Sequence, residues 1–133
     1  ALVATGYRGG EKIVIAKPLT YMNLSGVAVK QLVNKYKADI KDLIVVFDDV
    51  DIPKGTVRVR EKGSGGTHNG MRNIIQVMGT QEFPRVRVGI GPVPENVPIA
   101  DYVLSDVPAK ERQTLYDAFS LAADEAIKLI DKK

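Results

Sequence analysis

The sequence contains no cysteine, no tryptophan and only one histidine in 133 residues. Without a thiol the chain can form no disulfide bond, no thiolate metal site and no covalent intermediate on cysteine. Long apolar runs are also missing, because the longest uninterrupted one extends only from Leu43 to Phe47. A helix needs about 20 apolar residues to cross a bilayer, so we expect no membrane-spanning segment.

The composition that remains is that of an ordinary globular protein. Hydrophobic residues make up 44% of the chain and charged residues 26%, which excludes intrinsic disorder and predicts a single domain. Nineteen Lys and Arg against 16 Asp and Glu give a net charge of +3. This mild excess is compatible with a nucleic-acid partner but is also common in proteins that have none. The lack of cysteine fits a reducing compartment, so we expect a cytoplasmic protein.

Five segments read as β-strands from their patterns of apolar residues. They are residues 1–7, 12–16, 43–47, 56–61 and 84–91. The turn signal Arg8–Glu11 favours an antiparallel hairpin between the first two. The unbroken apolar run of the third predicts a strand that is buried on both faces. The fourth alternates strictly, which places Val57 and Val59 on one face and Arg58 and Arg60 on the other.

Three helices are predicted between and after these strands. The first follows a cap at Asn23 or Ser25, and the second begins near Asn69 with Met71, Ile74, Ile75 and Met78 at helical spacing. The third begins near Pro108, and its apolar stripe is Leu115, Phe119, Ala122, Ala126 and Ile130. Strands that alternate with helices predict a single three-layer α/β domain, with a mixed β-sheet flanked by helices.

The strongest local motif is a glycine-rich loop between a strand and a helix, which contains Gly63, Gly65, Gly66 and Gly70. Its backbone N–H groups and the positive end of the following helix could hold a phosphate. The spacing is neither a dinucleotide-binding fingerprint nor a Walker A motif. A flexible connector with no ligand is the alternative interpretation.

Two groups of polar residues could take part in a site, one before this loop and one within it. Asp48, Asp49 and Asp51 follow a predicted strand and either bind a cation or supply one functional carboxylate, but the closing Glu of a calcium loop is missing, so we expect no metal site. His68 could act as a general base if another group oriented it. A histidine at a helix start is more often a cap, which we favour. Asn69 could cap the helix or point its amide at a substrate, and Asn23 is equally open.

Basic residues are concentrated just before the predicted second helix. Lys54, Arg58, Arg60, Lys62 and Arg72 lie in a stretch whose single acidic residue is Glu61. This basic strip has the charge expected for contact with a phosphate backbone, although a solvated strand face would look the same. Tyr21, beside Met22, could stack on a base or fill the core.

Five motifs in this order resemble the bacterial-type peptidyl-tRNA hydrolase family. They are Pro18–Gly26, Asp48–Gly55, Lys62–Met71, Phe83–Gly91 and Asp101–Leu104. The resemblance implies an enzyme that hydrolyses the ester between peptide and tRNA without metal or cofactor. It also implies that Asn23 and Asn69 hold substrate and water, and that Asp48 orients a catalytic histidine. We also expect the protein to be a monomer and to bind no membrane.

The resemblance also implies that Tyr21 and Met22 line the cleft for the tRNA end and the peptide. The basic strip and the glycine-rich loop complete the expected tRNA-binding set with Arg58, Arg60, Gly63, Gly65 and Gly66. We expect the loops of Asn23, Asp48 and Asn69 to converge on one cleft. Members of the family carry their catalytic histidine in an upstream Thr-Arg-His-Asn motif that does not occur in these 133 residues.

From that difference we expect the chain to be an internal piece, truncated at its N-terminus and slightly at its C-terminus, and inactive by itself. His68 belongs to the glycine-rich motif and is not a replacement for the upstream histidine. Two other functions stay open. One is a non-catalytic RNA-binding relative of the same fold, and the other is an unrelated α/β domain that binds phosphate or nucleotides.

Overall fold

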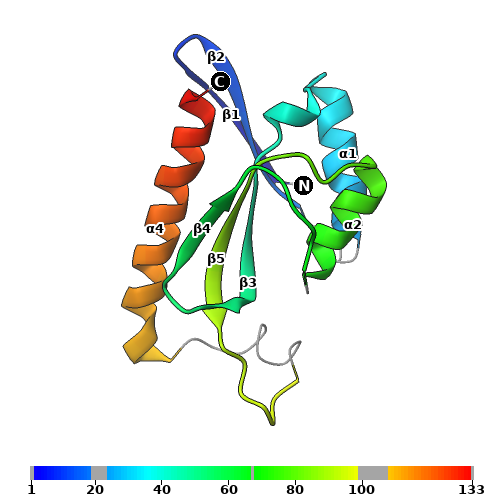
Figure 1. The fold of residues 1–133 in the computed structure, drawn as a ribbon. Coiled ribbons are helices and arrows are strands. Elements are labelled where there is room, and N and C mark those ends of the chain that lie inside the picture. The colour runs from blue at the N-terminus through cyan, green and yellow to red at the C-terminus, as the bar shows by residue number, and fades with distance from the viewer. Residues whose placement is uncertain (1, 19–23, 67, 99–107, 133) are drawn as a thin grey trace. The chain divides into compact units, whose positions relative to one another are not determined.

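The computed structural model describes residues 2–18, 24–66, 68–98 and 108–132 (Figure 1). The chain forms two compact units, each assembled from two separate segments. The first unit contains residues 1–38 and 64–80, and the second contains residues 39–63 and 81–133. Helices and a mixed sheet are both present, which confirms the α/β class. The organisation as one domain stays a prediction.

The first unit opens with the expected antiparallel hairpin. Strands β1 (Leu2–Arg8) and β2 (Glu11–Lys17) pair along their whole length, with Arg8 opposite Glu11. Gly9 and Gly10 alone form the turn, and both have positive φ angles, 57° and 82°. Two consecutive positive φ angles suit the right-handed twist of a hairpin and favour glycine. Arg8 and Glu11, predicted to lie in the turn, therefore belong to the strands.

Helices α1 (Ser25–Lys35) and α2 (Asn69–Met78) pack together in the same unit. The backbone N–H of Gly26 donates to Oδ1 of Asn73 at 2.6 Å, and a Cβ on Gly26 would lie 2.6 Å from the Asn73 carbonyl oxygen. Only glycine permits this approach. The predicted cap at Ser25 is wrong, because Leu24 occupies the cap position without a side-chain hydrogen bond and Ser25 is already helical. Asn23 lies outside the described residues.

The second unit contains a three-stranded mixed sheet in the order β3-β5-β4. The strands are β3 (Val45–Pro53), β4 (Val57–Arg60) and β5 (Arg85–Gly91), and a short 3-10 helix, η2 (Ile40–Asp42), precedes them. Strand β5 runs parallel to β3 and antiparallel to β4. Val86 and Val88 of β5 form the core with Ala118 and Ala122 of helix α4 (Ala109–Asp131).

Strand β3 differs from its prediction in length and in burial. It continues past Phe47 to Pro53, so the acidic cluster lies within the strand and not after it. The polarity of Asp48 and Asp49 does not end the strand, because their backbones pair with Val88 and Gly89 of β5. The expected burial on both faces is wrong, since Val46 is 51% exposed while Phe47 is buried.

Helix α4 begins directly after Pro108, as predicted, and most of its predicted stripe faces the core, because Leu115 and Ala122 are buried and Ala126 packs against the core cluster. Phe119, predicted to face the core, is 54% exposed, and the neighbouring Ala118 is buried instead. Small side chains at Ala118 and Ala122 let the helix backbone approach the valines of β5 closely. None of the helices in the described segments is long and apolar enough to cross a membrane.

Candidate functional site

The glycine-rich segment leads into the N-terminus of α2 through His68. His68 is the cap residue, and its Nδ1 accepts a hydrogen bond from the backbone N–H of Met71 at 3.1 Å. This bond satisfies one of the N–H groups that a helix start leaves unpaired. The interpretation of His68 as a cap is confirmed. Asn69 is the first helical residue and is exposed, so its amide does not serve as the cap.

The glycine-rich loop is attached to the start of α2. Nε of Arg72 donates to the carbonyl oxygen of Gly66 at 2.5 Å. Gly66 has a positive φ of 56°, and a Cβ on Gly65 would lie 2.8 Å from the backbone nitrogen of Arg72. These contacts explain why glycine is needed at both positions. Arg72 was expected in the basic strip, but its Nε donates to the backbone of the loop.

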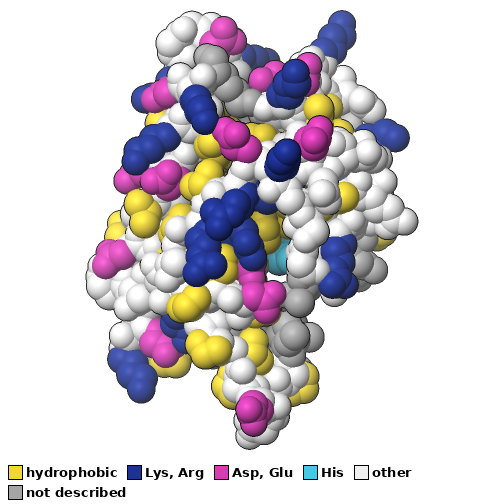
Figure 2. Space-filling model, viewed as in Figure 1, with side chains coloured by type: hydrophobic (Ala, Val, Ile, Leu, Met, Phe, Trp, Pro, Cys, Tyr) yellow, Lys and Arg dark blue, Asp and Glu magenta, His cyan; other side chains and the backbone are white. Residues whose placement is uncertain are grey.

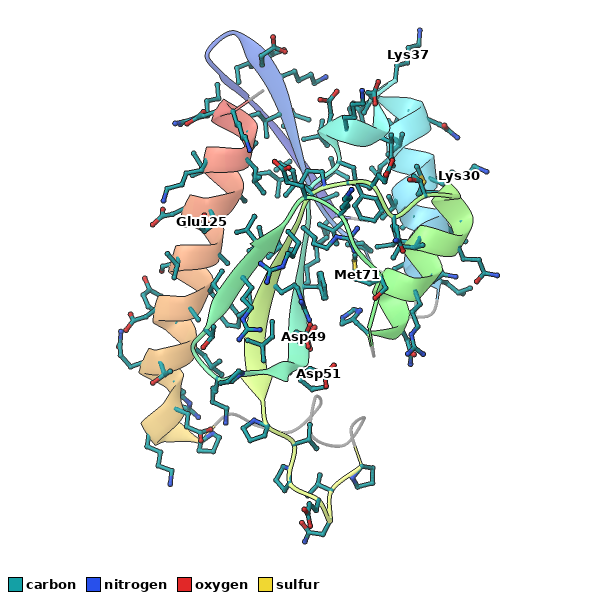
Figure 3. The ribbon with its side chains drawn as sticks, in the orientation of Figure 1. Lys30, Lys37, Asp49, Asp51, Met71 and Glu125 are labelled. Atoms are coloured by element: carbon teal, nitrogen blue, oxygen red, sulfur yellow. The ribbon has the colours of Figure 1, made fainter. Side chains whose placement is uncertain are left out.

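The acidic cluster separates into residues with different surroundings. Asp49 is buried, and its Oδ2 accepts a hydrogen bond from Nε of Arg87 at 2.7 Å and forms an ion pair with Nη2 of Arg87 at 2.6 Å. Its Oδ1 accepts from the backbone N–H of Asp51 at 2.8 Å, while Asp51 itself is exposed at the same end of β3 (Figure 3). Asp48 is half-buried. Among the described residues, no group of three His, Cys, Asp or Glu side chains could hold a metal ion.

Glycines of β5 allow this part of β3 to form. A Cβ on Gly89 would lie 2.1 Å from the carbonyl oxygen of Pro53, and one on Gly91 would lie 2.0 Å from that of Val50. The pairing register between the two strands shifts in the same place, between Asp49 and Pro53. The bulge therefore needs two glycines opposite it.

Arginines gather on one face of strands β4 and β5. Arg58 lies opposite Arg87 and Arg60 opposite Arg85 in the antiparallel ladder, and Figure 2 shows Lys and Arg side chains clustered over this sheet. Arg58 and Arg60 are exposed while Val57 and Val59 pack on the core, as predicted. Nη1 of Arg60 donates to its neighbour's carbonyl oxygen, on Val59, at 2.9 Å.

Not every residue of the predicted basic strip presents an uncompensated charge, because Lys54 is in an ion pair. Nζ of Lys54 donates to Oε2 of Glu111 at 2.7 Å, which ties the turn after β3 to the first turn of α4. Asp48 pairs in register with Val88, and Arg58 pairs with Arg87. Since paired residues share a face and neighbours in a strand alternate, Asp48 and Arg58 lie on opposite faces of this sheet.

Arg85 and the Asp49–Arg87 ion pair are two features that sequence reasoning missed. Arg85 is only 1% exposed, and burial, with a smaller effect of nearby Arg87, lowers the pKa of its guanidinium. Alternation along β5 places both arginines on the face opposite Val86 and Val88 but does not show that either is buried. The ring of Phe83 lies 4.6 Å from the Arg85 guanidinium. An aromatic residue two positions before Arg85 is the one local feature of the sequence that points to burial of this arginine.

The structure does not test the predicted positions of the other site residues. Tyr21, Met22 and Asn23 lie outside the described residues. Asp48 belongs to the second compact unit, whereas Asn69 belongs to the first. The convergence of the loops of Asn23, Asp48 and Asn69 on one cleft therefore stays a prediction.

Comparison with known proteins gives one consistent family. The family model for peptidyl-tRNA hydrolase matches residues 1–133. A peptidyl-tRNA hydrolase of Brevibacillus brevis is 49% identical over 124 residues, which are 93% of this chain and 66% of the relative. That of Alkaliphilus oremlandii is 45% identical over 130 residues, which are 98% of this chain and 70% of the relative.

A solved structure agrees with these relatives. The crystal structure of peptidyl-tRNA hydrolase from Acinetobacter baumannii matches with a TM-score of 0.88 at 27% identity, covering 98% of this chain and 66% of that one. The chain thus spans about two thirds of the length of the proteins it matches.

Proposed function

Because the chain belongs to the peptidyl-tRNA hydrolase family, we propose that the protein hydrolyses the ester bond between peptide and tRNA in peptidyl-tRNA. This reaction returns tRNA to translation, so the protein is assigned to the cytoplasm, where it acts as a monomer. The observation that carries the proposal is the match of the family model to residues 1–133. The described geometry adds an exposed arginine pair on β4, Arg58 and Arg60, and a half-buried carboxylate, Asp48, within one of the family motifs.

Asp48 is the proposed positioning carboxylate. Ester hydrolysis at neutral pH needs a base that takes a proton from the attacking water, and a carboxylate beside an imidazole fixes its tautomer and favours the imidazolium that forms. The base itself is the histidine of the family's Thr-Arg-His-Asn motif, which these 133 residues do not contain. His68 is unsuited to that role through Nδ1, since protonation there would break the helix cap.

The other motif residues supply binding. Asn69, exposed at the first position of α2, and Asn23 hold the substrate and the attacking water. Tyr21 and Met22 line the cleft for the tRNA end and the peptide. Arg58 and Arg60 contact tRNA phosphates, and backbone N–H groups of the glycine-rich loop bind a further phosphate. The proposed reaction requires neither a metal ion nor an organic cofactor.

The test is a peptidyl-tRNA hydrolysis assay on the full-length protein with a matched pair of variants. Asp48→Asn is expected to lower kcat by about 100-fold or more with little change in KM. Asp51→Asn removes an exposed carboxylate from the same strand and is expected to leave kcat near the wild-type value. Equal effects of the two substitutions would contradict the role of Asp48.

The same assay separates the other two functions. Binding of tRNA without any hydrolysis by the wild-type protein would point to a non-catalytic RNA-binding relative. Binding of mononucleotides with no preference for a tRNA 3′ end would point to an unrelated phosphate-binding domain. The isolated 133-residue chain is expected to be nearly inactive. Robust hydrolysis by that chain, abolished by His68→Ala, would identify His68 as the base and overturn this mechanism.

A further inference from the structure

Arg85 is the largest fully buried side chain among the described residues. It is the first residue of β5, and its side chain lies within the second compact unit. Burying a charged group is costly unless its hydrogen-bonding capacity is used. The partners of the guanidinium therefore indicate why an arginine is placed there.

The guanidinium donates to three backbone carbonyl groups. Nη1 reaches the oxygen of Gly63 and Nη2 that of Gln81, each at 2.5 Å. Nε and Nη2 both reach the oxygen of Phe83, at 3.3 and 3.2 Å. The N–H of Gly63 also donates to the oxygen of Gln81 at 3.3 Å. Arg85 thus closes a small hydrogen-bonded network that joins two distant points of the chain.

These two points enclose one continuous segment. Gly63 is the last residue before Ser64–Thr80, and Gln81 is the first residue after it. That segment carries the glycine-rich loop, His68 and Asn69, and it belongs to the other compact unit. Both ends of the excursion are therefore held by a single side chain at the start of β5.

We propose that Arg85 is a positioning residue, which clamps the two ends of the glycine-rich segment and so fixes the base from which Asn69 is presented to substrate. The guanidinium is planar, and its N–H donors form a fork that points in fixed directions. Because Nη1 binds the carbonyl of Gly63 and Nη2 that of Gln81, the distance between these two carbonyls is fixed. A lysine ammonium has no such fork. The catalytic part of this proposal rests on the proposed function, whereas the clamp itself does not.

The clamp is tested by amide hydrogen exchange of the full-length protein, comparing wild type with Arg85→Met and Arg85→Lys. Loss of the fork is expected to raise exchange in residues 63–81 at least tenfold, with little change in β3 and α4. Arg112→Met removes an exposed arginine of α4 and serves as the control with unchanged exchange. A rise of the same size throughout the protein would mean that Arg85 stabilises the whole protein and not this segment in particular, and it would overturn the clamp.

Steady-state kinetics of the folded variants test the positioning role. Arg85→Lys is expected to lower kcat at least tenfold per folded molecule, because small displacements of reacting groups cost large factors in rate. An unchanged kcat with increased local exchange would overturn the link to catalysis. If the wild-type protein hydrolyses no peptidyl-tRNA, the proposed function fails and the exchange result still decides the clamp.

A measurement on the unmodified protein covers the case in which neither variant folds. In the nuclear magnetic resonance spectrum, the Nη protons of Arg85 should be resolved and exchange slowly, since three carbonyls hold them. The Nη protons of Arg58, which is exposed on β4, supply the internal reference. Equally fast exchange of both arginines would overturn the clamp.

Discussion

Replacement of Asp49 should destabilise the protein through one defined ion pair. Asp49 is 7% exposed, and its carboxylate accepts a hydrogen bond from Nε of Arg87, forms an ion pair with Nη2 of Arg87 and accepts a hydrogen bond from the backbone N–H of Asp51. Asp49→Ala removes all three acceptor contacts and leaves the guanidinium without this partner. Asp49→Asn keeps an acceptor for the N–H of Asp51, but it loses the charge and replaces the oxygen that faces Arg87 with an NH2 group.

The expected cost follows from the burial of the two partners. Removing one member of a buried ion pair costs about 3–5 kcal/mol. The side chain of Arg87 keeps 27% of its surface exposed, so water can rehydrate much of its charge, and the expected cost lies at the bottom of this range or just below it. We expect Asp49→Ala to lower the free energy of unfolding by about 2–3 kcal/mol and Asp49→Asn by about 1–2 kcal/mol.

Urea denaturation of the full-length protein measures these differences through the shift in transition midpoint at constant slope. A double-mutant cycle with Arg87→Met isolates the pair, and we expect a coupling energy of about 1–2 kcal/mol. Asp51→Asn is the exposed control. The reasoning is refuted if Asp49→Ala changes the unfolding free energy by less than about 0.5 kcal/mol, as typical surface substitutions do, or if the cycle shows no coupling.

Three further predictions concern surface charge and the helix cap. Changing both Arg58 and Arg60 to Ala should weaken tRNA binding and reduce the slope of log K against log salt by roughly 0.7–0.9 for each lost phosphate contact, and an unchanged slope would assign both to a solvated face. His68→Ala should cost about 1 kcal/mol of stability in thermal unfolding, whereas His68→Asn, which can still cap, should cost less; equal losses would contradict the cap. The hydrogen bond and charge of Lys132 lower the pKa of Glu61, so Lys132→Met should move that pKa back up in a nuclear magnetic resonance titration. Because this pKa is lower in the folded state, the pair's contribution is present at neutral pH and is lost as pH falls through the folded-state pKa.

The sequence by itself determined the features that depend on a few neighbouring residues. Gly9 and Gly10 specify the hairpin because both adopt positive φ angles. His68 precedes a helical pattern and caps it, and the alternation of residues 57–60 assigns valines to the core and arginines to the surface. The family motifs are local features too, since each is a contiguous stretch that can be recognised from the sequence alone.

Tertiary structure alone decided which distant residues meet. Asp49 and Arg87 are 38 positions apart, and nothing in either neighbourhood specifies the register that joins them. Pairing with β5 also extended β3 through its acidic residues, against their low strand propensity. Arg85 is the clearest case, because alternation only places it opposite the core valines, whereas three backbone carbonyls that accept from its guanidinium allow it to be buried. Local patterns fix conformation, but burial and partners follow from contacts that only the folded chain brings together.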